Sequence, residues 1–282
     1  MELAQITAGQ VVMLFLLMGT GIAAVKTGVL KPEGKQTLSN LLVYLVVPAM
    51  IVNSYRMEFS MEILHNLLAS FGMSLLALLI GTGITLALTA RRKDSRTPIF
   101  RFACIFSNAA YMGFPLISAL FGSEGLLYAS AYVTVFNILL WTMGYGFVSG
   151  SSDPKEVLHS LLHTPVLYAM VIGLCIYLLQ IPVPQLIAQP LELMANMTTP
   201  LSMVITGMLL AAGDLGCIVR SKPVWKLAAV RMLLECCPSA AITSVFAVQF
   251  GHDESFAAGS VVLTTLLSIV ALPLCALVVT LL

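Results

Sequence analysis

Charged residues are scarce in this chain, since Asp, Glu, Lys and Arg make up only 10% of its 282 residues. Soluble globular domains run near a quarter charged, because they must solvate a whole surface. Hydrophobic residues make up 59%, and the mean hydropathy is +0.98. These values exclude a soluble domain and predict an integral membrane protein. The net charge of +1 also excludes a basic face for nucleic acid.

Catalytic and metal-binding patterns are lacking as well. The four histidines fall at the ends of hydrophobic segments or in the connections between them, and no H-E-x-x-H string occurs. Asp214 lies in an A-A-G-D-L-G string, but an intramembrane aspartyl protease would need a second aspartate within a span. The six cysteines are scattered through apolar runs and show no disulfide framework. We therefore expect no enzyme activity, no cofactor and no metal.

The apolar runs are long enough to cross a bilayer as helices. A crossing needs roughly 20 mostly apolar residues, and continuous runs favour helices over the alternating strands of a membrane barrel. The charge-free stretches are 3–25, 36–55, 66–90, 102–123, 125–152, 164–191, 193–213 and 255–282. A further apolar run at 223–251 completes nine segments. The first stretch lacks the basic start of a signal peptide, so we expect it to be a transmembrane helix.

The positive charges favour one orientation. The first, third, fifth and seventh connections hold 12 of the 14 lysines and arginines, whereas the even-numbered connections hold only Arg56. Cytoplasmic loops are enriched in Lys and Arg. We therefore predict a multi-pass protein whose odd-numbered connections are cytoplasmic and whose N-terminus is outside.

Four segments combine a helix breaker with uncharged polar side chains. The strings are V-V-P-A-M-I-V-N-S at Pro48, S-N-A-A-Y-M-G-F-P at Asn108, N-M-T-T-P at Thr199 and Pro200, and E-C-C-P-S at Pro238. Each alone is typical of an ordinary kink. In lipid, however, every freed backbone group must find a partner or line a wet cavity. Interrupted helices present N–H groups at mid-membrane, where they suit an anion, so the four together predict a transport site.

The order of these segments predicts an internal repeat. Pro48 and Pro200 occupy corresponding segments and lie 152 residues apart. An odd number of spans per half places the two halves in opposite orientations, which is the inverted-repeat plan of many secondary transporters. We predict two membrane units, residues 1–152 and residues 153–282.

Several pieces of the chain match one family. They are TGVLKPEGKQTLSNLLVYLVVPAMIVNS at 27–54, SNAAYMGFPL at 107–116, TTPLSMVITGMLLA at 198–211, CPSAAITSVFA at 237–247 and VVLTTLLS at 261–268. By these pieces the sequence resembles the auxin efflux carrier family of membrane transporters, in its bacterial branch. The resemblance implies an all-α fold of two inverted five-helix repeats, with the fourth helix of each broken and crossing its counterpart. It also implies a homodimer, an elevator-type movement and small organic anions as substrates.

The resemblance places a set of residues at the substrate site, through the two crossovers and the kinks beside them. The set is Asn108, Tyr111, Gly113, Pro115, Pro48, Thr199, Pro200, Pro238 and Ser239. We expect the Asn108 amide to donate to the anion. Backbone N–H groups around Gly113 and Ser239 would complete an uncharged cradle.

The second half is shorter than the family pattern. Equal repeats would place the second crossover near residue 260, whereas its candidate is Pro238, so about one helix is missing. The stretch 223–251 then either enters and returns as a re-entrant pair or crosses once, which leaves about 9–10 transmembrane helices. The missing helix also leaves an alternative function open, a non-transporting or degenerate membrane paralogue with a regulatory role.

Arg231 and Glu235 are the ionisable residues nearest to a broken segment. They lie four residues apart, share one helix face and can pair. Ionisable groups at membrane depth are candidates for coupling or substrate binding. The alternative is that Arg231 extends to the cytoplasmic surface beside Lys226.

These observations together predict a secondary carrier. Its substrate would be a small organic anion, such as a carboxylate or an auxin-like acid. Its place would be the lipid bilayer of a bacterial cytoplasmic membrane.

Overall fold

The computed structural model describes residues 2–31, 33–92, 94–150, 164–212, 215–235 and 237–281, which are built almost entirely from helices. Six helical stretches in this part of the chain are long and apolar enough to cross a membrane. They are Ala8–Lys26, Gly34–Ser54, Met61–Thr89, Tyr111–Ser149, Gln185–Ala211 and Glu254–Cys275. Large apolar side chains such as Leu68 and Met73 are exposed on the outer faces, as they are in a bilayer. The predicted fold class, an all-α integral membrane protein, is confirmed.

The first half contains three uninterrupted or gently kinked spans before its break. Helix α1 covers Glu2–Lys26; α2 (Gly34–Leu41), η1 (Leu42–Val46) and α3 (Val47–Ser54) form the second span, and α4 covers Met61–Thr89. The π-helical turn η1 lies directly before Pro48, whose ring would clash with the carbonyl four residues earlier in a regular α-helix. The predicted kink at Pro48 is therefore a local widening of the helix.

The fourth span is broken. Helix α5 (Thr97–Ile105) ends at Phe106, which has extended dihedral angles, and the helix resumes with η2 (Ala109–Gly113) and α6 (Phe114–Leu139). Gly122 interrupts α6 with φ 60° and ψ −148°, a conformation that is essentially restricted to glycine. The chain reverses there, and the rest of α6 continues through η3 (Leu140–Gly144) and α7 (Tyr145–Ser149).

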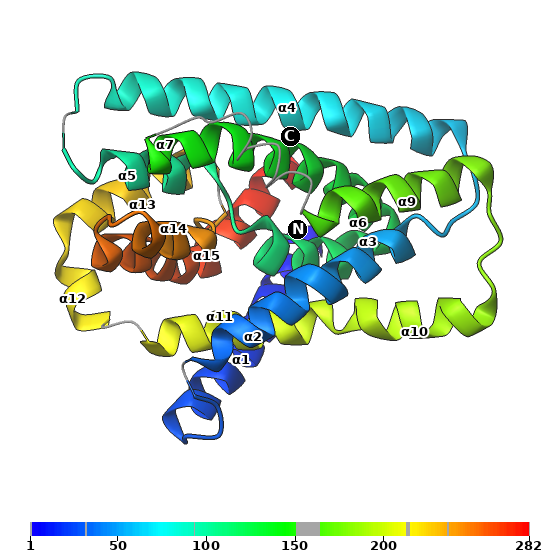
Figure 1. Cartoon of the computed structure of the whole chain (residues 1–282), viewed down its shortest axis with the longest axis horizontal. Helices are drawn as coiled ribbons and strands as arrows, with labels where there is room; N and C mark the ends of the chain where they lie inside the picture. Colours follow the sequence, from blue (N-terminus) through cyan, green and yellow to red (C-terminus); the bar gives the residue numbers. More distant parts are fainter. Residues whose placement is uncertain are drawn as a thin grey trace.

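The second half begins with α9 (Pro165–Leu179), α10 (Gln185–Asn196) and α11 (Thr198–Ala212). Helix α10 ends four residues before Pro200, where the proline ring would clash with the Asn196 carbonyl. The described chain then forms α12 (Leu215–Arg220), α13 (Lys222–Leu234), α14 (Ile242–Gln249) and α15 (Glu254–Leu281). Figure 1 shows α4 along one long edge of the molecule and α10 with α11 along the other.

Helices α13 and α14 form a hairpin that turns back inside the molecule. The start of α13 lies beside the start of α15, because a Cβ on Gly259 would be 3.3 Å from the Val224 side chain. The far end of α14 returns to the same place, where His252 donates a hydrogen bond to the Val148 carbonyl at 2.8 Å. Between them, the Ser239 N–H reaches the Thr264 hydroxyl at 3.0 Å. Of the two predicted paths for 223–251, the structure therefore shows the one that enters and returns.

The depth of this hairpin follows from helix geometry. Thr264 lies ten residues along α15, and a rise of 1.5 Å per residue places it about 15 Å from the start of that helix. This is about half of a roughly 30 Å hydrocarbon core. The hairpin therefore turns at about half of that thickness from the start of α15.

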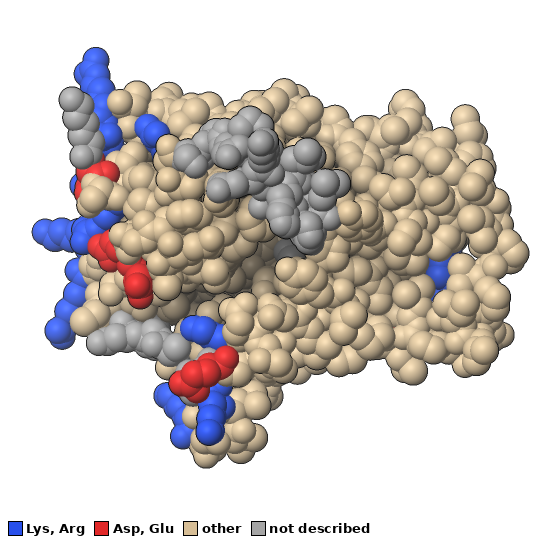
Figure 2. Space-filling model, in the orientation of Figure 1, with Lys and Arg blue, Asp and Glu red and all other residues tan. Residues whose placement is uncertain are grey.

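Charged side chains gather at one end of the long axis. Figure 2 shows Lys, Arg, Asp and Glu crowded at this end and almost none along the rest of the visible face. This end, called the basic end below, holds the α4–α5 connection with Arg91, Arg92 and Arg96. The α3–α4 connection with Arg56 lies at the opposite end, because the 29 residues of α4 run about 43 Å between the two. An uncharged middle between polar ends is the pattern of a membrane-spanning body.

Helices α1 and α11 pack backbone against backbone. A Cβ on Gly207 would collide with the Met18 carbonyl oxygen, and one on Gly21 would collide with Val204. Small residues allow this close approach of membrane helices.

We expect Gly207→Ala to lower the thermal midpoint of the purified protein markedly, because the added methyl group meets main-chain atoms that cannot rotate away. Gly19→Ala on α1 is the matched control, since a Cβ there meets nothing within 4 Å. Equal midpoints for the two variants would contradict this packing.

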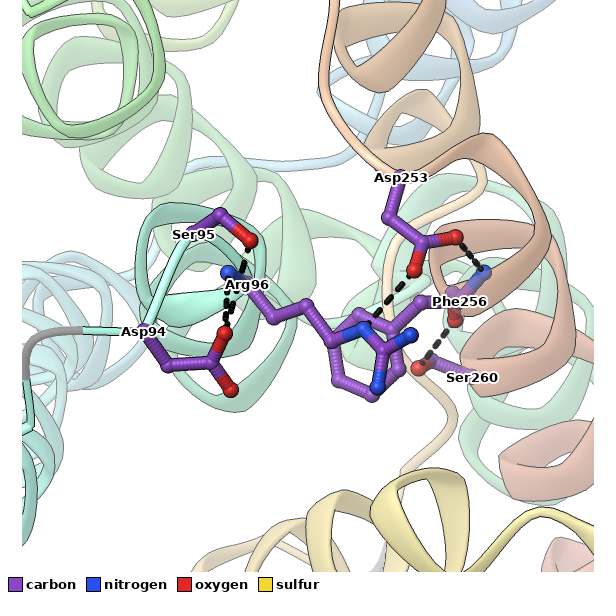
Figure 3. Close-up of polar contacts among 6 residues, drawn as sticks. All are labelled: Asp94, Ser95, Arg96, Asp253, Phe256 and Ser260. Carbon is purple, nitrogen blue, oxygen red and sulfur yellow. Dashed lines mark hydrogen bonds and ion pairs between the residues drawn. The ribbon is translucent and has the colours of Figure 1, made fainter.

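An ion pair joins the two halves at the basic end. Arg96 Nε lies 2.7 Å from an Asp253 carboxylate oxygen, and the other carboxylate oxygen accepts the Phe256 N–H at 2.9 Å, capping α15 (Figure 3). The guanidinium also lies over the Phe256 ring at 5.6 Å. Burial raises the pKa of Asp253, but the Phe256 N–H and the Arg96 guanidinium outweigh it and hold the pKa below its usual 3.8.

This lowered pKa predicts a small, pH-dependent gain in stability. Asp253 stabilises the fold above its ordinary pKa, and the gain is lost as the pH falls through the lower folded-state pKa. Because both side chains are partly exposed, we expect it to be below about 1 kcal/mol. Asp253→Asn keeps the cap and removes the charge. The midpoints of wild type and variant should differ at pH 7 and converge toward pH 3; a difference independent of pH would refute the role of the charge.

Candidate functional site

The two broken segments meet as a short antiparallel bridge between Ser107 and Ser239. The Asn108 N–H donates to the Pro238 carbonyl at 2.9 Å, and the Ala240 N–H donates to the Phe106 carbonyl at 2.9 Å. Each break thereby satisfies backbone groups that the other one frees, as lipid surroundings require. The structure thus brings together Asn108, Pro238 and Ser239, which the sequence analysis placed at one site.

Two helices begin at this bridge. η2 starts at Ala109 and α14 starts at Ile242, directly after the paired residues. The first N–H groups of a helix have no acceptor within their own helix, and they carry the positive end of its dipole. The crossing therefore presents positive backbone potential without a formal charge.

A cavity of about 550 Å³ opens onto the crossing. It extends from Lys35 and Gln249, toward the basic end, to Asn108 and Ala240. Polar and aromatic side chains from several elements make up much of the remaining lining. They are Gln36, Ser39 and Asn40 of α2, Tyr44 of η1, Ser107 in the first break, Tyr111 of η2, Phe136 and Asn137 of α6, Trp141 of η3, Thr164 just before α9, and Phe246 of α14. Among the described residues of the lining none is acidic, and Lys35 is the one cation. The cavity suits a small anion with an apolar body.

Two amides are held on the cavity wall. Asn108 is only 4% exposed, and its main-chain carbonyl accepts the Met112 N–H at 3.0 Å, which fixes its backbone. Asn137 donates to the Val133 carbonyl of its own helix at 2.7 Å. Sequence reasoning missed Lys35, Trp141 and Phe246 as parts of this wall. Lys35 lies within the matching piece 27–54, but no feature of that piece marks it as a binding residue.

The other predicted site residues do not line the large cavity. Ser239 is completely buried, and its hydroxyl has no partner among the described residues. Thr199 lines a second, smaller pocket. Pro200 is exposed and Pro115 is buried at the start of α6. Gly113 and Pro48 are partly buried and line neither of the two cavities.

Arg231 is fully buried directly behind the crossing. It donates to the Cys104 carbonyl at the end of α5 (2.7 Å), to the Cys237 carbonyl in the second break (3.0 Å) and to the Glu235 carboxylate (2.6 Å). The side chain therefore does not extend to the surface beside Lys226. Its charge faces carbonyl groups at the C-terminal end of α5, where helix dipoles favour a cation. The arrangement holds the two breaks in register.

The described residues contain no group of three or more His, Cys, Asp or Glu side chains placed to hold a metal ion. The cavity wall offers amides, backbone N–H groups and aromatic faces, which bind small molecules by hydrogen bonds and stacking. Such a site can hold and release an anion without altering it.

The fold and this site define a polytopic membrane protein with a binding cavity at a crossing of broken helices. The sequence model of a family described as Membrane transport protein matches residues 6–159 and 154–237. The chain belongs to that family, which is of the auxin efflux carrier type, and it is a membrane transport protein. The predicted family is confirmed.

Two relatives carry similar names. An uncharacterized transporter of Methanothermobacter thermautotrophicus is 25% identical over 278 residues, which cover 88% of this chain and 90% of the relative. An uncharacterized transporter of Methanocaldococcus jannaschii is 23% identical over 214 residues, covering 71% of this chain and 68% of the relative. Both relatives are archaeal, and neither name states a substrate.

Proposed function

We propose that this transporter is a secondary carrier for a small organic anion. The observation that supports this most is the cavity that opens onto two helix N-termini and the Asn108 amide, with no acidic residue among the described residues of its lining. Its volume of about 550 Å³ falls within the roughly 300–1,000 Å³ typical of small-molecule sites. The carboxylate of the anion lies at the crossing, and its body lies between the aromatic side chains of the wall.

The mechanism proposed is alternating access by an elevator-type movement of the crossed unit. The tightly packed α1–α11 pair is the fixed scaffold, and the α13–α14 hairpin moves together with α5 and α6, to which Arg231 ties it. Arg231 and Glu235 then act as a clamp within the moving unit and not as a coupling site. The units 1–152 and 153–282 are inverted repeats, the second with a shortened crossover.

The proposed setting is the cytoplasmic membrane of a prokaryote, bacterial as the sequence resemblance implies, with the basic end in the cytoplasm and the N-terminus outside. The protein is a homodimer and is not an enzyme. In the sequence analysis, the shortened second half left a non-transporting paralogue open as the alternative. Both breaks and both helix N-termini are nevertheless present where the cavity meets the crossing, and this supports the carrier over the paralogue.

Flux through the purified protein tests this proposal. The protein is reconstituted into liposomes, and uptake of labelled malonate, malate, benzoate and indole-3-acetate is compared with uptake of their uncharged amides. We expect saturable uptake of at least one anion, well above that of protein-free liposomes, and none of its amide. Uptake of no anion in the panel would overturn the carrier assignment and favour the regulatory alternative.

A further inference from the structure

A second, smaller pocket of about 170 Å³ lies toward the Arg56 end of the molecule. It is formed where α3, both parts of α6, the end of α10 and the start of α11 come together. Its lining residues are Met50, Asn53, Ser54, Phe114, Ser118, Gly122, Ser123, Leu126, Ala195, Asn196, Thr198 and Thr199. Seven of these twelve are polar but uncharged. The pocket therefore offers hydrogen-bonding groups without a formal charge.

The two cavities lie in series along the same helices. In the second span, Val47 lines the large cavity, whereas Met50 and Asn53 line the small one. In the fourth span, Tyr111 lines the large cavity and Phe114 lines the small one. Three residues of helix correspond to about 4.5 Å. The partition between the cavities is therefore only about one helical turn thick, and it contains the buried side chains of Met50 and Phe114.

Several polar side chains of the small pocket can donate hydrogen bonds, although the hydroxyls of Ser54 and Thr198 already donate to main-chain carbonyls. Arg56 donates to the Asn53 side-chain oxygen at 2.7 Å, which leaves the Asn53 NH₂ group as the one free to face a ligand. Asn196, Ser118, Ser123 and Thr199 can donate as well. None of the described lining residues is acidic. A helix ends and another begins both at Asn196–Thr198 and at Gly122, so the helix dipoles largely offset each other and the donors of the pocket are its side chains.

We propose that this pocket is a second binding station for the carboxylate group of the transported anion, loaded from the Arg56 end. The inference rests on the proposed function, because it assigns the same ligand class to both cavities. At about 170 Å³ the pocket is smaller than a typical ligand site and accepts a carboxylate head group or a very small anion. The anion thus meets the donors of the small pocket on one side of the partition and the crossing on the other.

The test measures half-saturation concentrations for uptake from each end of the protein separately. Vesicles of the two orientations are prepared with the wild type, with Thr199→Val and with Asn196→Ala. Thr199→Val keeps the side-chain volume, so its folding is the least disturbed. Thr20→Val is the matched control, because Thr20 is exposed on α1 and lines neither cavity.

For each variant we compare the half-saturation concentration for uptake from the Arg56 end with that for uptake from the basic end. We expect the ratio of the first to the second to rise about tenfold in each pocket variant. One lost hydrogen bond to a charged group is worth a change of this order. The control should leave the ratio unchanged. An unchanged ratio in both pocket variants, or an equal loss of flux from both ends, would overturn the second station. Absence of flux in the wild type would instead refute the proposed function itself.

Discussion

Asn108→Ala is expected to reduce anion uptake to the level of protein-free liposomes while the protein still folds. The main chain of residue 108 makes the contacts that hold the crossing, since its N–H donates to Pro238 and its carbonyl accepts from Met112. Alanine keeps both contacts. What it removes is the side-chain amide on the cavity wall, and with it the hydrogen bond that we propose it donates to the anion. In a dry site such a bond contributes about 1.5–3 kcal/mol.

A second substitution at the same position separates charge from shape. Asn108→Asp has nearly the same volume as the wild type, but it places a negative charge beside the anion, so we expect it to abolish uptake as well. Asn66→Ala is the control, because Asn66 is exposed on α4 and lines neither cavity. Size-exclusion profiles report folding. Uptake by Asn108→Ala at the wild-type rate would remove Asn108 from the site.

Arg231→Met is expected to destabilise the protein more than any other single change considered. The buried guanidinium donates to two main-chain carbonyls and to Glu235, and methionine leaves all three acceptors without that donor. Breaking a buried ion pair by removing one partner costs about 3–5 kcal/mol. This is a large part of the roughly 5–15 kcal/mol by which proteins are stable. The thermal midpoint in detergent should therefore fall by many degrees.

The double variant Arg231→Met/Glu235→Gln distinguishes the ion pair from the carbonyl contacts. Removing the orphaned charge should restore part of the stability, because the partly buried Glu235 carboxylate no longer lacks its partner. The Cys104 and Cys237 carbonyls stay without their donor, so recovery should be incomplete. The stability loss of the double variant is compared with the sum of the losses of Arg231→Met and Glu235→Gln. Equality of the two would show that Arg231 and Glu235 do not act as a pair.

The breaks were predictable from the sequence because their signals are local. Proline, glycine and asparagine within an apolar run near Asn108 and Pro238 disfavour a continuous helix wherever the chain goes next. The Arg231–Glu235 pair was equally predictable from the spacing of four residues. The missing helix was visible as a difference in spacing between the two halves.

The path of residues 223–251 could not be predicted, because its cause is not local. An apolar run of this length suits one crossing as well as a hairpin. The end at which the chain leaves the membrane depends on contacts such as Arg96 with Asp253, which are 157 residues apart. The large cavity could not be predicted for the same reason. Lys35, Trp141 and Phe246 are ordinary residues in their own segments, and only the packing of α2, η3 and α14 brings them to one wall.

The most direct test of the central claim, that the two breaks meet to form one site, is a cross-link between Ser107 and Ser239. Residues paired in this way in an antiparallel bridge have Cα atoms about 4.5 Å apart, which is within the range for a disulfide. Both are changed to cysteine in a protein whose six native cysteines are replaced, and a protease site is placed between α7 and α9. After oxidation and cleavage, the account predicts that the two fragments stay joined until a reductant is added. Ser107→Cys with Ser244→Cys, farther along α14, should leave them separate. Fragments that separate in the Ser107–Ser239 variant would contradict the account.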